Sequence, residues 1–366
     1  MVLVSSMIHS FLSCLSVVNI KYKKWRLKVW ARNKLKDYVP DPGVLTASRR
    51  KEIIDFFKPY ARPYIKFNQF YTEKTGRFYA DYIPDDMYIT AIDQYYNDWD
   101  KAVKLDDKCY YDRLFSYMGF KQPETLCYRI NGLWLDRDYL PITSENAYKI
   151  IDDAGAAFFK KSVESEGGHG VYYFNKAGNI GNISSIAEKI GDNIIVQRPI
   201  KQSPVLAKIN TSSVNTIRML SMLNRDGSVK IYSSILRMGV NGSCVDNASS
   251  GGITCGIMSD GRLKDRAFTA KGVRFDRHPD SKICFDTVVI PNFGSICEMV
   301  RKAHPQLANF RLLSWDIALG QDNEPILLEI NMRFGQLDFH QLNNGPVFGE
   351  DTIKILDEVF GKKTIK

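Results

Sequence analysis

The sequence predicts an α+β protein in which a helical N-terminal region precedes a unit built from antiparallel β-hairpins. Up to about residue 118 the apolar side chains recur at helical spacing, whereas from residue 156 onward short runs of β-branched and aromatic residues alternate with turns. Two of these runs flank the segment NRDG (224–227), and Asp-Gly is a strong hairpin signal. With 366 residues, 44% of them hydrophobic, the chain can fill a large core.

Three helices are predicted in the N-terminal region and one near the C-terminal end. After the helix breakers in VPDPGVLT, Thr46 or Ser48 is suited to cap a helix over 48–60, because its hydroxyl can accept a hydrogen bond from the first turn. The other helices are expected over 86–104, 107–118 and 349–360.

The strands are predicted to form two hairpins and several shorter pairs. One hairpin joins 216–223 to 228–238, and the other joins 311–319 to 325–331. Three shorter strands are expected over 156–160, 171–175 and 194–200, the last ending at Pro199. The predicted division of the chain is an apolar and basic segment (1–40), a mainly helical region (41–105) and a unit over 106–366 with lobes of about 106–200 and 201–366.

The positive charge of the chain lies almost entirely in one block. The net charge is +9, yet residues 21–36 hold eight Lys/Arg and no acidic residue, which leaves 42 basic against 41 acidic residues elsewhere. A folded body that binds nucleic acid carries a basic patch or stripe of its own. The nearly neutral body therefore argues against a nucleic-acid partner.

The N-terminal segment predicts a peripheral contact with an anionic membrane through residues 1–36. Residues 1–20 contain no charged side chain, and a helix would align five of their apolar residues on one stripe, namely Val4, Ile8, Phe11, Leu15 and Val18. The basic block that follows would meet acidic headgroups. Two alternatives stay open. One is a helix that spans the membrane, although its five serines make it a poor fit. The other is a packed or frayed helix followed by a solvated run of charges, which has the same sequence pattern.

The seven cysteines predict a reducing compartment. They are at least eleven residues apart and form neither a C-x-x-C pair nor a Cys/His cluster at zinc spacing. We therefore expect free thiols and a cytoplasmic protein, placed peripherally on the inner face of the membrane if residues 1–36 bind lipid.

The strongest candidate site is an oxygen-rich cluster on the second hairpin. If its turn is centred between Asp322 and Asn323, Asp316 falls opposite Glu329, and the two-residue period places Asn331 on the same face. Like charges directly opposite one another destabilise a sheet. A hard cation such as Mg²⁺, which takes oxygen ligands, would neutralise such a pair of carboxylates. The alternative is that Asp316 pairs with an arginine and Asn331 merely ends the strand.

A glycine-rich segment follows Lys160 in the sequence KKSVESEGGHG. Gly167, Gly168 and Gly170 would let the backbone turn sharply and direct its N–H groups at a phosphate. The segment is neither a Walker A loop nor a dinucleotide fingerprint, and a plain hairpin turn with a solvated His169 explains it about as well.

Two basic residues could complete a phosphate site. Lys108 is predicted at the start of a helix, and Arg218 lies on an apolar strand where a buried guanidinium needs an anion. A surface lysine is the alternative for Lys108. The small residues Asn247, Gly251 and Gly252 form a segment that could approach a ligand or could be an ordinary loop.

The order of these motifs resembles the ATP-grasp superfamily over residues 86–348. The sequence is most similar to the sugar-transfer-associated ATP-grasp proteins of surface-polysaccharide gene clusters, through four segments: DDKCYYDRLF, KKSVESEGGHGV, SSVNTIR and LLEINMRFGQLDFHQ. The resemblance implies an ATP-grasp fold with nucleotide held between two β-rich lobes, and it makes 106–366 the catalytic unit. Two positions depart from the family pattern, Lys161 for a proline and Gln197 for a glutamate.

The resemblance also implies a role for each site residue. Lys108 and Lys160 would hold the ATP phosphates, under a lid formed by 165–170 with Ser165, Gly167, Gly168 and Gly170. Gln197, Arg198 and Ile200 would belong to the hinge that meets adenine. Arg218 would contact the γ-phosphate or an acyl phosphate, and so act catalytically with Lys160. The implied ligands of Mg²⁺ are Asp316, Glu329 and Asn331.

The activity implied is that of an ATP-dependent carboxylate-amine ligase. A carboxylate would attack the γ-phosphate of ATP, and an amine would capture the acyl phosphate, on a small-molecule or glycan-linked precursor of a surface polysaccharide. Two alternatives remain: a phosphotransferase acting on a hydroxyl, which needs the same nucleotide site, and a catalytically silent nucleotide-binding scaffold.

Overall fold

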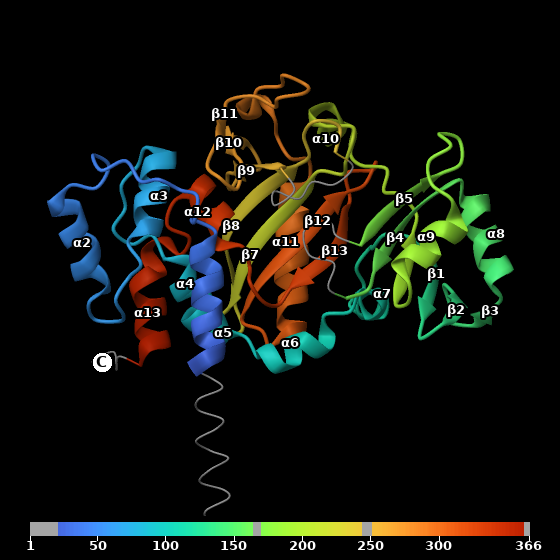
Figure 1. The fold of residues 1–366 in the computed structure, drawn as a ribbon, viewed down its shortest axis with the longest axis horizontal. Coiled ribbons are helices and arrows are strands. Elements are labelled where there is room, and N and C mark those ends of the chain that lie inside the picture. Colours follow the sequence, from blue (N-terminus) through green and yellow to red (C-terminus); the bar gives the residue numbers. More distant parts are fainter. Residues whose placement is uncertain (1–20, 164–169, 244–250, 362–366) are drawn as a thin grey trace, which may run out of the picture. The chain divides into compact units, whose positions relative to one another are not determined.

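The computed structural model describes residues 21–163, 170–243 and 251–361 (Figure 1). The chain divides into two compact units. Unit 1 contains the described residues up to Tyr96 together with those from Gly345 onward, and unit 2 is Asn97–Asn344. The division therefore falls nine residues before the predicted boundary at 105/106, and residues from Gly345 onward group with the N-terminal region instead of the second lobe.

Unit 1 is helical. Residues 21–33 form its first helix, and the other elements are α2 (Ala47–Phe57), α3 (Lys66–Thr75), α4 (Asp85–Met87), the π-helical turn η1 (Tyr88–Ile92), α5 (Asp93–Tyr96), the 3-10 turn η6 (Gly349–Asp351) and α13 (Thr352–Phe360). Thr46 caps α2 by accepting a hydrogen bond from the backbone N–H of Arg49, which confirms one of the two predicted caps.

Helix α13 belongs to unit 1 because aromatic residues of that unit hold it. Tyr60 donates a hydrogen bond to Asp357 (2.9 Å), and Tyr96 donates one to Glu358 (2.9 Å). The helix also packs against η1. These contacts explain why the C-terminal helix does not join the second lobe.

The predicted helix over 86–104 is interrupted at Asn97. Its first part ends at Tyr96, and its second part is α6 (Trp99–Leu105) in unit 2. Asn97 donates through Nδ2 to the carbonyl of Leu312 (2.7 Å) and accepts from the backbone N–H of Leu312 (3.0 Å). The chain leaves the helix because Asn97 pairs with a strand, and Asp98 then caps α6.

Two antiparallel sheets form the frame of unit 2. The smaller has the order β3-β2-β1-β6-β4-β5, with β1 (Thr125–Ile130), β2 (Leu133–Asp136), β3 (Pro141–Ile142), β4 (Ala156–Lys161), β5 (Val171–Asn175) and β6 (Ile194–Gln197). The larger has the order β11-β10-β9-β8-β7-β12-β13, with β7 (Thr216–Leu223), β8 (Val229–Met238), β9 (Ile253–Ile257), β10 (Leu263–Phe268), β11 (Arg274–Phe275), β12 (Leu312–Leu319) and β13 (Pro325–Asn331). The predicted α+β class is confirmed.

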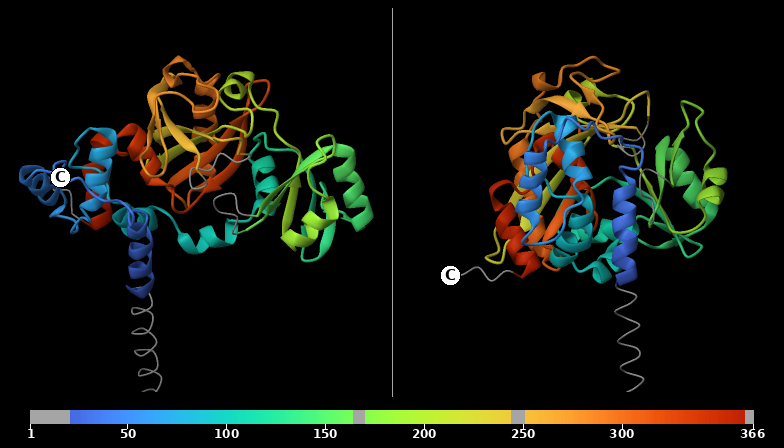
Figure 2. Two further views of the ribbon diagram at one scale, coloured as in Figure 1. Left: turned by 45° about the horizontal axis from the view of Figure 1, so that its top comes forward. Right: turned by 60° about the vertical axis from the view of Figure 1, so that its left-hand side comes forward.

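Helices cover both faces of the smaller sheet. On one face α8 (Ser144–Ala154) and α9 (Ile183–Ile190) pack over β4 and β6 (Figures 1 and 2). On the other face α7 (Lys108–Tyr117) reaches the sheet through Cys109, which packs against Tyr128 and Ile195. The start of α7 therefore lies on the face opposite α8 and α9.

The larger sheet has one apolar face and one face with buried charges. Ile217, Leu236 and Trp315 point into a core shared with α11 (Phe293–Ala303). Since successive residues of a strand point to opposite faces, Arg218 and Asp316 lie on the other side. There α12 (Leu337–Asn344) packs over β8, β9 and β10. The remaining short elements are α10 (Pro204–Ile209), η4 (Phe285–Thr287) and η5 (His304–Leu307).

Candidate active site

A row of charged side chains crosses the larger sheet. Asp316 on β12 pairs with Glu329 on β13, as the hairpin register predicted, and on its other side it pairs with Arg218 on β7. Residues opposite one another share a face of the sheet, so the three side chains form one line. Asn331 follows Glu329 by two residues and donates a long hydrogen bond to Asp316 Oδ2 (3.5 Å).

Asp316 is buried between two arginines. The Arg218 guanidinium donates through Nε to Oδ1 (2.7 Å) and through Nη2 to Oδ2 (2.5 Å), and Arg237 Nη1 donates to Oδ2 (2.9 Å). Burial alone would raise the pKa of Asp316, but the two positive charges outweigh it and hold that pKa well below its usual range. The alternative in which Asp316 pairs with an arginine is therefore part of the structure.

Arg237 is a site residue that the sequence did not reveal. It is buried beside Arg218 on the neighbouring strand β8, and Arg218 is fixed further by a hydrogen bond to Gln336. A β-bulge between β7 and β8 shifts their register by one residue. A one-residue shift exchanges the two faces of a strand, so the hairpin pattern alone could not place Arg237 on the charged face.

Lys108 connects α7 to both sheets. Its Nζ lies 3.1 Å from Glu329 Oε1, while its backbone N–H donates to the carbonyl of Ser162 (2.9 Å) just beyond β4. Burial lowers the pKa of Lys108, but the Glu329 carboxylate more than compensates, and the pKa is raised overall. Lys108 is thus a positively charged group held at the carboxylate cluster, not the surface lysine of the alternative interpretation.

The oxygen atoms at this cluster are of the type that binds Mg²⁺, although those of Asp316 accept hydrogen bonds from two arginines. Two carboxylates and one amide on adjacent strands offer the hard oxygen ligands that Mg²⁺ prefers. The Glu329 side chain is 30% exposed, whereas both oxygens of Asp316 already accept hydrogen bonds from arginine. Among the described residues no group of three or more His, Cys, Asp or Glu side chains gathers around a metal-sized space, so Asn331 would have to serve as the third ligand.

Lys160 and Lys161 point to opposite faces of the smaller sheet. Phe159 lies in the core under α8 and α9, so Lys161 shares that side and Lys160 faces the side of α7. Lys160 Nζ donates to Gln197 Oε1 (3.0 Å), and Lys161 is exposed. The structure therefore brings Lys160, Gln197 and the start of α7 to one face.

We expect Lys160→Ala to raise the dissociation constant for ATP by about tenfold or more, and Lys161→Ala to change it little. Loss of a charge-assisted hydrogen bond to phosphate costs about 1.5–3 kcal/mol. Equilibrium titration with ATP in the presence of Mg²⁺ measures both constants, with Lys161→Ala as the matched control. Equal dissociation constants for the two variants would show that Lys160 does not bind the phosphates.

The predicted hinge lies at the end of β6 and lines an open hollow of about 570 Å³. Arg198, Ile200 and the turn between β12 and β13 contribute to its walls. The Arg198 side chain is paired with Glu124 (2.8 Å), and its backbone N–H donates to the Glu124 carbonyl (2.8 Å), so this amide is not available to adenine. Strand β6 ends at Gln197 instead of continuing to 200 because Pro199 lacks an N–H.

Several predicted residues lie outside the described part of the chain. These are Ser165, Gly167, Gly168 and His169 of the glycine-rich segment, and Asn247. Gly170 is described and has a φ of +75°, and an added Cβ would lie 3.1 Å from Lys161 Cβ. The chain therefore requires glycine at this position beside β4.

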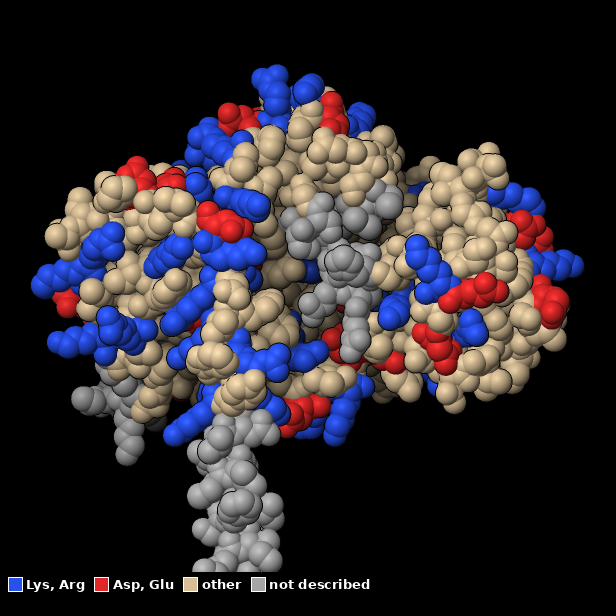
Figure 3. Space-filling view, in the orientation of Figure 1, with Lys and Arg blue, Asp and Glu red and all other residues tan. Residues whose placement is uncertain are grey.

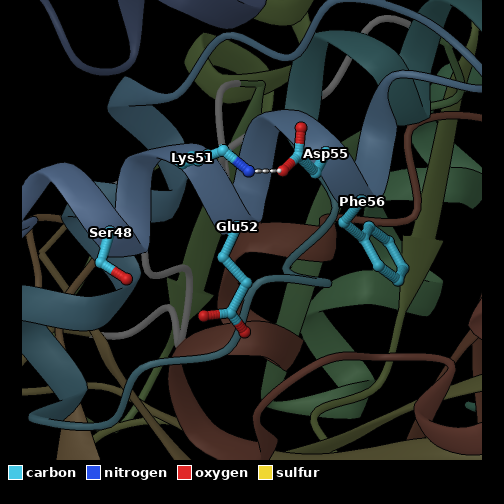
Figure 4. Close-up of a pocket in the computed structure, with 5 residues that line it drawn as sticks. All are labelled: Ser48, Lys51, Glu52, Asp55 and Phe56. Atoms are coloured by element: carbon cyan, nitrogen blue, oxygen red, sulfur yellow. Dashed lines mark hydrogen bonds and ion pairs between the residues drawn. The ribbon is translucent and has the colours of Figure 1, made fainter.

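A second hollow lies in unit 1 and has no link to this chemistry. It is formed by one side of α2, where Lys51 pairs with Asp55 four residues on (2.8 Å) (Figure 4). All five residues that line it come from this single helix or its start, and none was predicted to bind a ligand. An i,i+4 ion pair of this kind is typical of a solvated helix face.

Comparison with known proteins identifies a family match over most of the chain. Residues 89–355 match the family described as sugar-transfer associated ATP-grasp. No curated protein matches the sequence.

The solved structures that match the chain include three enzymes at low identity and low TM-score. The N5-carboxyaminoimidazole synthetase from Staphylococcus aureus, complexed with ADP, is 12% identical with a TM-score of 0.39, over 67% of this chain and 52% of that one. The biotin carboxylase domain from Hydrogenobacter thermophilus, in complex with MgADP, is 12% identical (TM-score 0.39; 64% and 41%). The D-alanyl-alanine synthetase A from Vibrio cholerae is 12% identical (TM-score 0.39; 70% and 65%). The chain thus spans between two fifths and two thirds of the length of these proteins.

Proposed function

Because the chain belongs to the sugar-transfer associated ATP-grasp family, we propose that it is an ATP-dependent ligase that joins a carboxylate to an amine. The observation that carries this proposal is the row of Arg218, Asp316 and Glu329 across the larger sheet, with Lys108 held against it from α7. Three positive side chains meet two carboxylates in this cluster, since Arg237 also contacts Asp316. A site with this balance is suited to an anionic nucleotide.

The proposed reaction needs positioning and charge neutralisation more than a protein nucleophile. A substrate carboxylate oxygen bonds to the γ-phosphorus while the bond from that phosphorus to the ADP oxygen breaks. The amine then attacks the carbonyl carbon of the acyl phosphate, inorganic phosphate leaves, and the amine proton passes to solvent. In this scheme Lys108 and Lys160 hold the phosphates, and Arg218 meets the charge that develops on the transferred group.

Mg²⁺ is proposed as a cofactor on the same grounds. Glu329 and Asn331 would hold it together with Asp316, and when bound it would neutralise phosphate charge. Asp316 has a second role that does not depend on the ion, because it fixes the guanidinium groups of Arg218 and Arg237 through three hydrogen bonds. The pair Lys108–Glu329 connects the phosphate-binding residues to the proposed metal ligands.

The substrate is proposed to be a sugar, amino-acid or glycan precursor of a surface polysaccharide. The family description, sugar-transfer associated, supports this class. We also propose a reducing, cytoplasmic location, because the five cysteines in the described ranges are free thiols, three of them buried.

Release of ADP and phosphate across a panel of carboxylates, each with and without amines, tests the proposal. A ligase is expected to release free phosphate only when both substrates are present. If ADP forms with a hydroxyl acceptor and the phosphate stays on that acceptor, the protein is a phosphotransferase instead. Nucleotide binding without ADP formation under every condition would contradict both activities and identify a silent scaffold.

A further inference from the structure

The helix over 21–33 of unit 1 has one side that packs on the unit. Ala31 is fully buried and Leu35, four residues on, is 4% exposed. Arg32 pairs with Asp86 (2.7 Å), and Lys34 pairs with Asp85 (3.1 Å). These contacts fix the C-terminal end of the helix and the turn that follows it, and they engage the positive charges of Arg32 and Lys34.

A second apolar stripe runs along the same helix on a different side. Tyr22, Trp25 and Val29 are 55%, 58% and 38% exposed, and their spacing of three and four residues aligns them. At 100° per residue this stripe is turned well away from Ala31 and Leu35. The rings of Tyr22 and Trp25 stack with centroids 5.9 Å apart, so two large aromatic groups form one exposed surface.

Positive charges flank this stripe on both sides. Helical geometry places Lys21 and Lys28 along one edge and Arg26 along the other, where its guanidinium lies over the Tyr22 ring. No acidic residue occurs between 21 and 36. Figure 3 shows Lys and Arg side chains gathered over this part of unit 1. The exposed side therefore combines an aromatic centre with a basic rim.

We propose that the face formed by Tyr22, Trp25 and Val29 with Lys21 and Lys28 binds an anionic membrane surface. Trp and Tyr favour the headgroup region because their rings are amphipathic, and basic side chains beside them attract acidic lipids. A surface that binds nucleic acid or another polyanion by charge alone would not need the aromatic stripe.

The helix would lie in the plane of the interface. Within the described ranges no helix is both long enough and apolar enough to cross a bilayer. The apolar stripe predicted for residues 1–20 lies outside the described part of the chain, and the present proposal does not depend on it. It is independent of the ligase proposal too, since Lys108 and the other site residues belong to unit 2.

Co-sedimentation of the full chain with vesicles tests the proposal. We expect binding to vesicles of phosphatidylcholine mixed with phosphatidylglycerol, and little binding to phosphatidylcholine alone. Lys21→Gln/Arg26→Gln/Lys28→Gln should weaken the partition coefficient by about 100-fold, at roughly fivefold for each charge. Tyr22→Ala/Trp25→Ala/Val29→Ala should weaken it by at least about tenfold.

A matched control removes exposed apolar groups elsewhere. Tyr117 and Leu140 are exposed in unit 2, so Tyr117→Ala/Leu140→Ala should bind vesicles like the wild type. Substitutions on the exposed stripe are preferable to a deletion of 1–36, which would also remove buried Ala31 and Leu35 and the Arg32–Asp86 pair.

Three results would overturn the proposal. One is a wild-type chain that fails to sediment with the acidic vesicles at low salt. Another is an aromatic variant that binds those vesicles as tightly as the wild type, which would reduce the surface to a general polyanion binder. The third is a wild-type chain that binds duplex DNA more tightly than it binds the vesicles, together with an aromatic variant that loses DNA binding to the same extent. This result would identify nucleic acid as the partner instead.

Discussion

Asp316→Asn is expected to lower the free energy of unfolding by about 3–5 kcal/mol and to abolish turnover. Removing one partner of a buried ion pair leaves the other charge uncompensated, and here Arg218 and Arg237 would both lose their counter-ion. Both arginines are nearly inaccessible to solvent, so water cannot replace the carboxylate. Denaturant unfolding and ADP release measure the two effects.

The same carboxylate makes a distinctive contribution to acid stability. Its pKa in the folded protein lies well below the unfolded value of about 3.9, so the charged form stabilises the fold. That contribution is complete above the unfolded pKa and is lost as pH falls from about 4 towards the folded pKa. The free energy of unfolding of the wild type should therefore fall over this pH range. That of Asp316→Asn should fall less, because the variant lacks this titrating group.

An exposed carboxylate of the same sheet serves as the control for Asp316. Asp322 lies in the turn between β12 and β13 and pairs with Lys121, and both side chains are about half exposed. Asp322→Asn is expected to change the unfolding midpoint little because surface ion pairs contribute little. If Asp316→Asn were as stable as Asp322→Asn, the two arginines would not depend on this carboxylate.

Glu329→Gln is expected to lower turnover by about 100-fold or more with little loss of stability. The substitution keeps the shape of the side chain but removes the charge that faces Lys108 and that would bind Mg²⁺. Loss of a single preorganised electrostatic group at an active site costs about 10²–10³ in rate. Steady-state ADP release at saturating Mg·ATP measures the effect, and thermal unfolding checks the fold.

Glu324→Gln is the matched control for this variant. Glu324 lies in the turn before β13 and is exposed, so its amide variant should retain wild-type turnover. Near wild-type activity for Glu329→Gln would remove Glu329 from the proposed site. Equal loss in both variants would mean that the hairpin, and not the Glu329 charge, determines the rate.

Features that depend on neighbours in sequence were predictable, and those that depend on distant strands were not. A single hairpin turn sets the pairing of Asp316 with Glu329, and the prediction is confirmed. Arg218 lies directly opposite Asp316 as well, but the two residues are 98 positions apart, and no local pattern shows that β7 lies beside β12. The position of Arg237 could not be predicted either, because the bulge in β8 exchanges the two faces of the strand and leaves no signal in the sequence.

The interrupted helix at Asn97 shows the same limit in the helical region. The apolar spacing over 86–104 is helical throughout. Asn97 nevertheless forms hydrogen bonds with Leu312, which is 215 residues further along the chain. Tertiary hydrogen bonds outweigh local helix propensity, which amounts to less than about 1 kcal/mol per residue. Helix α7, in contrast, begins at Lys108 as predicted, because Asp107 caps it locally.

The grouping of α13 with the N-terminal helices has a consequence for synthesis. Unit 2 is encoded between the two parts of unit 1, so the ribosome releases all of unit 2 before α13 emerges. During that interval Tyr60 and Tyr96 lack the carboxylates of Asp357 and Glu358 that hold α13 in the finished protein. A nascent chain would therefore carry the whole of unit 2 while Tyr60 and Tyr96 of unit 1 still lack their partners on α13, and exposed aromatic residues are the kind of surface that chaperones bind and that misassembles when it stays exposed.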